Sequence, residues 1–185
     1  MRIIPLLVIA LIIVALALTS RADELEDPAL AALSQQELRA LAQVHAINDL
    51  EIRVGRLALD RGSPQVEAYA KHLVADHEKA DAELLALARD HHATLPEYQP
   101  VAPDDQAAMA LDAVHAQVLA NLSGASFDRT FLSMMVEDHR RALAALDAEL
   151  GRRGDADAMA LFARARPMVA HHEAEARELL ASIQH

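Results

Sequence analysis

The breaks between stretches of helical periodicity are the feature of this sequence that most constrains its fold. Apolar residues recur at the i, i+3, i+4 and i+7 spacing over most of the chain, a period that predicts amphipathic helices. Glycine, proline and serine interrupt the pattern at residues 62–64, 93–103, 123–126 and 151–154. Residues of these types end one helix and begin the next. We therefore predict helices over residues 35–61, 64–92, 104–122, 127–150 and from 155 almost to the C-terminus.

The lengths of these helices and of their connections indicate the fold class. Four of the helices have roughly 25–30 residues, which makes each about 40 Å long at 1.5 Å per residue. The short breaks at 62–64 and 151–154 force the helices on either side to run antiparallel, which gives two helical hairpins. The longer segment 93–124 joins the hairpins where ferritin-like bundles carry their long connection. We expect an all-α chain in which residues 34–185 form a ferritin-like antiparallel four-helix bundle, with a short extra helix in the crossover.

The first 33 residues differ in composition from the rest of the chain. Met1-Arg2 precedes an apolar run over residues 3–18, and Ser20 and Ala22 then supply small residues at the −3 and −1 positions that a signal peptidase reads. We predict that residues 1–22 are a cleaved signal peptide and that residues 23–33 are an acidic linker. An uncleaved membrane anchor is the alternative, because the apolar run is close to the length that spans a bilayer. The expected location is the periplasm or cell envelope.

Charge and cysteine usage exclude several classes of function. The formal net charge is −11, which gives no electrostatic basis for binding a phosphate backbone, so nucleic acid is not an expected partner. The chain has no cysteine, which excludes disulfides, thiol catalysis, thiolate zinc sites and Cys-ligated iron–sulfur clusters. A metal ion would have to be held by His, Met or carboxylate side chains.

One titratable residue interrupts the apolar stripe of each long helix: Glu51, His77, His139 and His172. Counted from the connecting turns, Glu51 and His77 lie within about 6 Å in height, and His139 and His172 within about 7 Å. A buried carboxylate is costly unless it is paired or ligated, and a buried imidazole needs partners for both nitrogens. We predict that the four side chains hold one divalent transition-metal ion, which could be Zn, Cu, Ni or Fe. A metal-free network of buried polar groups is the alternative.

Five further residues are candidates for supporting this site. Three lie one helical turn from a predicted ligand and could orient it: Asn48 beside Glu51, Asp81 beside His77 and Glu175 beside His172. Met135 and Met168 each precede a predicted His ligand by four residues and could supply soft sulfur suited to Cu(I).

Six motifs resemble those of a known family. They are Asn48-x-x-Glu51, Gly55-x-Leu57-Ala58, Val74-x-Asp76-His77, Gly124-Ala125-x-Phe127-Asp128, Asp138-His139 and Pro167-x-x-x-x-His172. Over roughly residues 34–182 the chain resembles an exported, ferritin-like bacterial family that is catalogued as a domain of unknown function. The resemblance implies a ferritin-like bundle exported to the periplasm or outer envelope, and it implies no particular activity.

A second, local resemblance concerns the fourth predicted helix. The segment Phe131-x-x-Met134-Met135-x-x-Asp138-His139-x-x-Ala142 is similar to an exported helical family associated with copper and silver binding. That family usually has His-His where this chain has Asp138-His139.

The predicted ligands do not match the dinuclear sites of ferritin-like oxidases. Those sites use Glu-x-x-His motifs, whereas Val74, Val136 and Val169 stand three residues before the histidines here. The sequence therefore favours a mononuclear site.

Three hypotheses for the function follow from these observations. The first is an exported metal-binding protein that serves metal handling or stress tolerance in the envelope. The second is a metal-free helical scaffold or interaction module. The third is a metal-dependent oxidoreductase, although no nucleophile–base pair, phosphate-binding loop or nucleotide motif is present and we predict no catalytic residue. The expected partner is the metal ion; a homo-oligomer is compatible with the sequence, and membrane contact is expected only through an uncleaved N-terminal segment.

Overall fold

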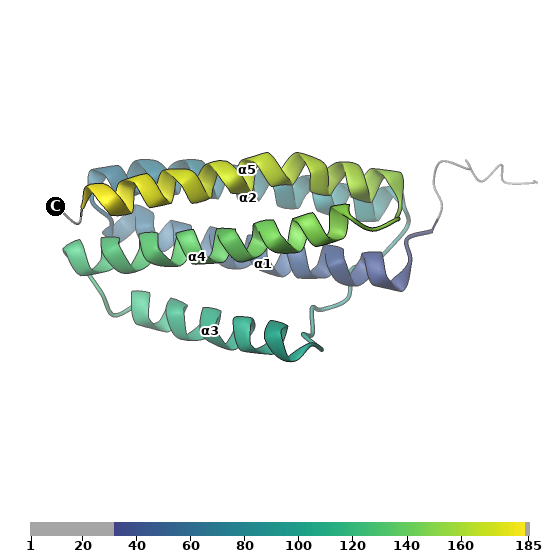
Figure 1. Cartoon of the computed structure of the whole chain (residues 1–185), viewed down its shortest axis with the longest axis horizontal. Helices are drawn as coiled ribbons and strands as arrows, with labels where there is room; N and C mark the ends of the chain where they lie inside the picture. The colour runs from purple at the N-terminus through teal and green to yellow at the C-terminus, as the bar shows by residue number, and fades with distance from the viewer. Residues whose placement is uncertain (1–31, 184–185) are drawn as a thin grey trace, which may run out of the picture.

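A computed structural model describes residues 32–183 as five α-helices (Figure 1). They are α1 (Gln35–Arg61), α2 (Pro64–Asp90), α3 (Pro103–Leu119), α4 (Gly124–Leu150) and α5 (Ala156–Ser182). No strand occurs in this part of the chain, so the predicted all-α class is confirmed. The predicted signal peptide, and the predicted linker up to residue 31, lie outside the described residues.

The helix ends follow from local hydrogen bonding and backbone geometry. The Ser34 hydroxyl accepts from the backbone N–H of Glu37, whose carboxylate accepts from the backbone N–H of Ser34, so a capping box opens α1. Asp155 caps α5 by accepting from two backbone N–H groups of its first turn.

Three of the predicted helices begin or end two or more residues away from the bounds in the structure. The second helix ends two residues earlier than predicted, at Asp90, because His92 adopts a left-handed backbone with φ of 51°. The third begins at Pro103, whose fixed φ suits a first helical turn, and it ends at Leu119. The fourth begins at Gly124, which has φ of 58°, a conformation that costs glycine little.

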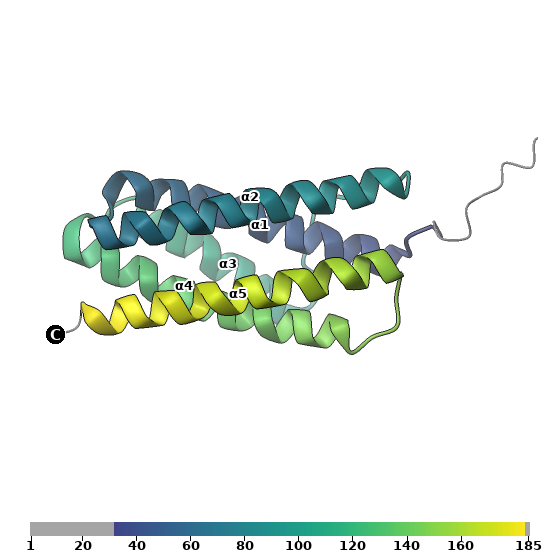
Figure 2. The same cartoon turned by 90° about the horizontal axis from the view of Figure 1, so that it is seen from above.

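The four long helices form the predicted ferritin-like bundle of two hairpins. The α1–α2 hairpin packs against the α4–α5 hairpin, with α2 beside α5 on one face of the molecule (Figure 2). On the opposite face, α3 crosses from one hairpin to the other and lies against α4 (Figure 1). α5 continues through Pro167 without interruption of the helix.

The apolar core is divided into two clusters by a polar layer. One cluster is built around Tyr69, Phe127 and Phe131, and the other around Leu41 and Phe162. On each long helix the residues of the first cluster lie on one side of a buried titratable residue, and those of the second cluster lie on the other. The four long helices therefore bring their polar residues to one level inside the bundle.

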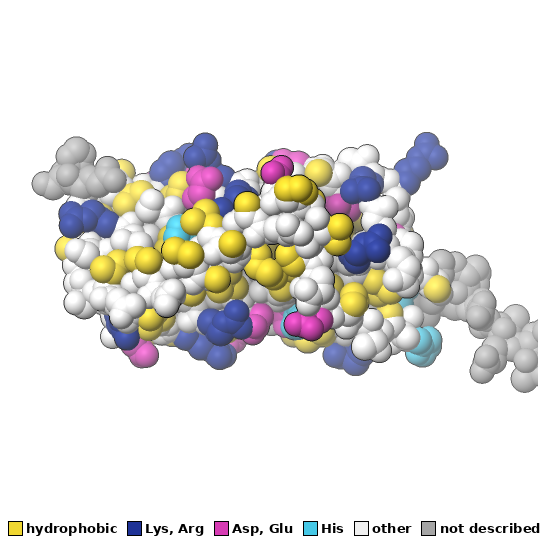
Figure 3. Space-filling view, turned by 90° about the horizontal axis from the view of Figure 1, so that it is seen from below, with side chains coloured by type: hydrophobic (Ala, Val, Ile, Leu, Met, Phe, Trp, Pro, Cys, Tyr) yellow, Lys and Arg dark blue, Asp and Glu magenta, His cyan; other side chains and the backbone are white. Residues whose placement is uncertain are grey.

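The outer face of α3 is apolar. Its exposed side chains include Met109, Leu111, Val114 and Val118, and hydrophobic atoms gather along this face of the molecule (Figure 3). No helix within residues 32–183 combines the length and apolarity that crossing a bilayer requires.

Candidate metal centre

The four residues predicted as metal ligands all lie in the polar layer. Glu51 of α1 is 3% exposed, His77 of α2 is 3%, His139 of α4 is 2% and His172 of α5 is 0%. Each side chain interrupts the apolar stripe of its helix, and the bundle turns that stripe inward. The structure therefore buries all four residues at the same level.

The three imidazole rings face one another. The ring centroids of His77 and His139 lie 5.8 Å apart, and the ring centroid of His172 lies 5.4 Å from each of the other two. One ligand atom from each ring lies within 4.8 Å of those of the other two. We call these residues the histidine triad. The difference in height expected between His139 and His172 does not keep their rings apart.

One nitrogen of each triad ring is held by a hydrogen bond to an oxygen acceptor. His77 Nδ1 donates to Asn48 Oδ1 over 2.9 Å, and His139 Nδ1 donates to the carbonyl oxygen of Met135 over 2.9 Å. His172 Nε2 lies 3.0 Å from Asp76 Oδ2. An amide oxygen, a carbonyl oxygen and a carboxylate can only accept, so each of these nitrogens carries the proton.

The other nitrogen of each ring is buried without a hydrogen-bond partner among the described residues. These atoms are His77 Nε2, His139 Nε2 and His172 Nδ1. Since the opposite nitrogen carries the proton, each presents a lone pair. A buried acceptor without a partner costs about 1–3 kcal/mol, so three such nitrogens on neighbouring rings are unusual for a hydrogen-bonded core.

Glu51 lies beside the triad and is not within the group of mutually close ligand atoms. Its Oε2 atom is buried and has no hydrogen-bond partner in the described part of the chain. Burial raises the pKa of Glu51 well above its ordinary value, and repulsion from Asp138 and Asp112 adds to the effect.

The triad is neutral at physiological pH. Burial lowers the pKa of His77 and that of His139 to about 3, with a contribution from the neighbouring rings. Burial also lowers the pKa of His172, although its contact with Asp76 acts in the opposite direction. Neutral imidazoles have the protonation state that metal coordination requires, so no proton has to leave these rings.

The residues present fit a mononuclear transition-metal site. Three converging imidazole nitrogens are a common protein donor set, and a carboxylate can complete four-coordination. The three contacts that hold the opposite nitrogens are the type that fixes ring orientation in metal sites. The donor set, its tautomers and its unpartnered atoms all agree with this chemistry.

The residues predicted to orient the ligands make different contacts from those expected. Asn48 bonds to His77 across the α1–α2 seam and not to Glu51. Asp81 accepts from His45 Nδ1 over 2.6 Å and lies 3.4 Å from Asn48 Nδ2, so its hydrogen bonds support Asn48 and do not reach His77. The prediction considered neighbours on the same helix, whereas these contacts cross between helices.

Glu175 is also displaced from its predicted role. It lies 3.9 Å from His72 and 3.7 Å from His171, and Asp76 takes its place beside His172. Sequence reasoning gave Asp76 no role as a partner of a ligand, because it lies about 100° from the core stripe of α2. The signal that could have identified Asp76 was its position directly before His77, because this position lies on the side of α2 that faces α5.

The two methionines that were considered as sulfur ligands lie in different surroundings. Met135 is fully buried, and its backbone carbonyl is the group that holds His139. Met168 lines a cavity that reaches the site, and its side chain is partly buried.

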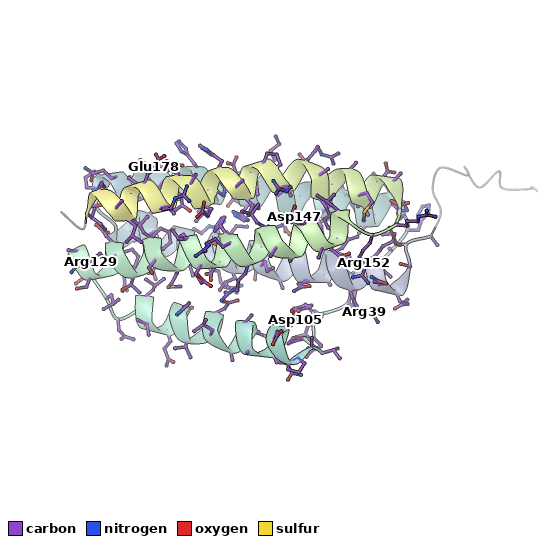
Figure 4. The ribbon with its side chains drawn as sticks, in the orientation of Figure 1. Arg39, Asp105, Arg129, Asp147, Arg152 and Glu178 are labelled. Carbon is purple, nitrogen blue, oxygen red and sulfur yellow. The ribbon has the colours of Figure 1, made fainter. Side chains whose placement is uncertain are left out.

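This cavity has a volume of about 280 Å³ and ends at Glu51, His77 and His139. Most of its remaining lining is apolar and comes from α1, α4 and α5, including Val44 and Phe162. Asp105, near the N-terminal end of α3, also lines it (Figure 4). The cavity gives a small molecule a route to the level of the triad.

Two other groups of acidic and histidine side chains lie close enough together to hold a cation. Asp112 and Asp138 belong to the first, with His115, but Arg141 bridges both carboxylates at 2.7 and 2.6 Å. The second contains His91, Asp155 and Asp157, and the Asp155 oxygen nearest His91 already caps α5. In both groups, protein donors already engage carboxylate oxygens.

Comparison with known proteins gives a family and a similar fold. The domain of unknown function DUF4142 matches residues 22–179. A crystal structure of a DUF305 fragment from Deinococcus radiodurans has a TM-score of 0.64 and 19% sequence identity, and the match covers 83% of this chain and 99% of that one. At this identity the likeness shows the fold alone. A search of curated proteins finds no match. Because the family match spans most of the sequence, the chain belongs to the family defined by DUF4142.

Proposed function

We propose that this protein is exported and binds one divalent transition-metal ion inside the bundle, with a role in metal handling or stress tolerance in the cell envelope. His77, His139 and His172 are the proposed ligands, and Glu51 is the proposed fourth. The observation that carries the proposal is the convergence of three buried, unprotonated imidazole nitrogens that have no hydrogen-bond partner among the described residues.

The energetics favour a metal site over a metal-free scaffold. Three imidazole acceptors and one carboxylate oxygen lie buried and unpaired at one level. At about 1–3 kcal/mol for each group, they would together cost several kcal/mol in a protein of ordinary stability. A divalent ion satisfies all of them and also compensates the charge of the Glu51 carboxylate.

The donor set restricts the ion to a class. Neutral imidazole and carboxylate suit Zn(II), Cu(II), Ni(II) and Fe(II), and no thiolate is available to favour softer ions. Valine, and not the glutamate of a dinuclear Glu-x-x-His motif, stands three residues before each triad histidine, which supports a mononuclear site.

Elemental analysis tests the proposal. The protein is expressed with export and without a histidine tag, and its metal content and melting temperature are measured before and after chelation. We expect about one metal ion per chain, and its saturation at 100 times Kd should add about 2.7 kcal/mol of stability. A folded protein that contains no metal and is not stabilised by Zn²⁺, Cu²⁺, Ni²⁺ or Fe²⁺ would support the metal-free scaffold.

Matched variants locate the site. His139→Ala should abolish stoichiometric uptake, whereas His92→Asn removes an exposed imidazole just beyond the C-terminal end of α2 and should leave uptake unchanged. Asn is chosen because it tolerates the left-handed backbone of His92. Equal metal content in both variants would contradict the ligand assignment. Fractionation of the producing cells tests the proposed export.

The cavity favours a second candidate function, a metal-dependent oxidoreductase. A space of about 280 Å³ that ends at Glu51, His77 and His139 could admit a small substrate. The protein would then bind and orient that substrate beside the ion. Azide added to Co²⁺-loaded protein should shift the visible absorption if a coordination position is open, and an unchanged spectrum would argue against this candidate.

A further inference from the structure

A second cluster of possible metal ligands lies on the surface beside the histidine triad. α2 and α5 run side by side in opposite directions (Figure 2). On α2, His72 and Asp76 are four residues apart, and on α5, His171 and Glu175 are also four residues apart. This spacing places both members of each pair on one helical face. We call His72, His171 and Glu175 the seam cluster.

The Glu175 carboxylate lies between the two histidines of the seam cluster. Its Oε1 is 3.9 Å from His72 Nδ1, and its Oε2 is 3.7 Å from His171 Nε2. These separations exceed hydrogen-bond length, and Oε2 is buried without a hydrogen-bond partner among the described residues. The carboxylate is therefore near two donor groups without bonding to either.

The same separations are close to those in a metal site. Two ligands at about 2.1 Å from a tetrahedral ion are about 3.4 Å apart. The ligand atoms of the seam cluster do not all lie within 4.8 Å of one another, so His72 and His171, whose side chains are 65% and 68% exposed, have to rotate to share an ion with Glu175. Exposed side chains can make such rotations at little cost in packing.

Asp76 connects the seam cluster to the triad. Its side chain is 45% exposed, and its Oδ2 lies 3.0 Å from Nε2 of the fully buried His172. The ring of His172 is also 6.2 Å from that of His171. His172 therefore has one nitrogen directed toward the seam and the other toward the triad.

The two sides of the triad differ in polarity. The cavity between α1 and α4 is lined mainly by apolar side chains. The α2–α5 seam carries two carboxylates and two imidazoles. A hydrated divalent cation loses solvation energy in an apolar passage, so the polar seam is its easier approach.

We infer that His72, His171 and Glu175 form a second, solvent-accessible site for a divalent transition-metal ion, and that Asp76 links it to the buried triad. This site binds more weakly than the triad because its ligands are exposed and mobile. Its role in loading the triad rests on the proposed function, whereas its own metal binding does not.

The experiment counts Ni²⁺ ions bound to untagged, metal-free protein by isothermal titration. Wild type should bind two ions, one tightly and one weakly. His72→Ala/His171→Ala should retain the tight ion and weaken the other by roughly tenfold or more, since even residues that only orient ligands are worth 10–100-fold in affinity. Both substituted residues are exposed, so this variant should fold, and circular dichroism checks that it does. His92→Asn, which removes another exposed histidine, should bind as wild type does.

The outcomes separate this inference from the proposed function. One tight ion in both wild type and His72→Ala/His171→Ala overturns the seam site and leaves the triad intact. One weak ion that is lost in His72→Ala/His171→Ala but kept in His139→Ala supports the seam site and overturns the triad.

Loading kinetics test the link between the two sites. At Co²⁺ concentrations below saturation of the seam, stopped-flow absorbance of the buried site should rise several-fold more slowly in His72→Ala/His171→Ala than in wild type. Equal rates would overturn the loading role.

Discussion

Replacing Glu51 by Gln should make the metal-free protein more stable, by an amount that grows with pH. Glu51 is 3% exposed, and its pKa in the fold is raised well above the 4.5 of an ordinary glutamate, chiefly by burial. The folded state therefore holds a proton that the unfolded state has released. Wild-type stability falls as pH rises from 4.5 toward the raised pKa, whereas a Gln side chain does not titrate.

The magnitude follows from this difference in proton binding. Each pH unit over which only the folded state is protonated costs wild type about 1.4 kcal/mol. Between pH 5 and pH 7, the stability of Glu51→Gln relative to wild type should increase by up to about 3 kcal/mol. Hydrogen bonds gained or lost by the amide do not vary with pH, so the slope tests the reasoning independently of any constant offset.

The assay is urea denaturation at pH 5, 6 and 7 in the presence of a chelator, with wild type and variant measured together. A difference that stays constant across this range, or that moves in favour of wild type as pH rises, would refute the reasoning. It would mean that the Glu51 carboxylate is charged and compensated in the metal-free fold. In saturating Zn²⁺ the order should reverse, because the Gln variant lacks the anionic ligand.

Three other substitutions test the surroundings of the site. Gly55→Ala should lower the free energy of unfolding by about 1–2 kcal/mol, because the added Cβ would lie 2.6 Å from a methyl of Val74 on the neighbouring helix. In the control Gly151→Ala, the added Cβ meets nothing closer than 3.5 Å. Equal urea midpoints for the two variants would contradict this prediction. Asn48→Ala removes the acceptor that holds His77, so the affinity for the metal should fall roughly 10–100-fold with little change in helix content. Competition with a chromophoric chelator measures this affinity. An unchanged affinity would show that the hydrogen bond does not orient the ring. Phe131→Ala leaves a void in a fully buried position and should cost about 3–5 kcal/mol in thermal or urea unfolding, and a loss below 1 kcal/mol would show that the core refills it.

The fold was largely predictable because its determinants are local. Prolines, glycines and caps mark the helix ends, and the apolar period marks the buried faces. Boundaries shifted where backbone geometry decides them, as at His92 and Gly124, since one residue with a positive φ changes where a helix begins or ends.

The burial of the four predicted ligands was predictable for the same reason. A polar residue on an apolar stripe has to be buried, and similar distances from the turns bring such residues to one level. The side chains that hold the ligands were less predictable, because which helix faces a given ring depends on packing between hairpins. Asp81 and Glu175 are one turn from a histidine in sequence, yet Asn48 and Asp76 make the contacts from neighbouring helices.

The polar layer also affects how the bundle comes apart. Because it divides the apolar core, the two ends of the molecule share few buried apolar contacts, and each is a separate candidate for local opening. An ion held by α2, α4 and α5 at that level would join the two ends into one cooperative unit. Hydrogen exchange would then slow at both ends of the helices at once, far from any ligand, and loading of the buried site would be registered across the whole bundle.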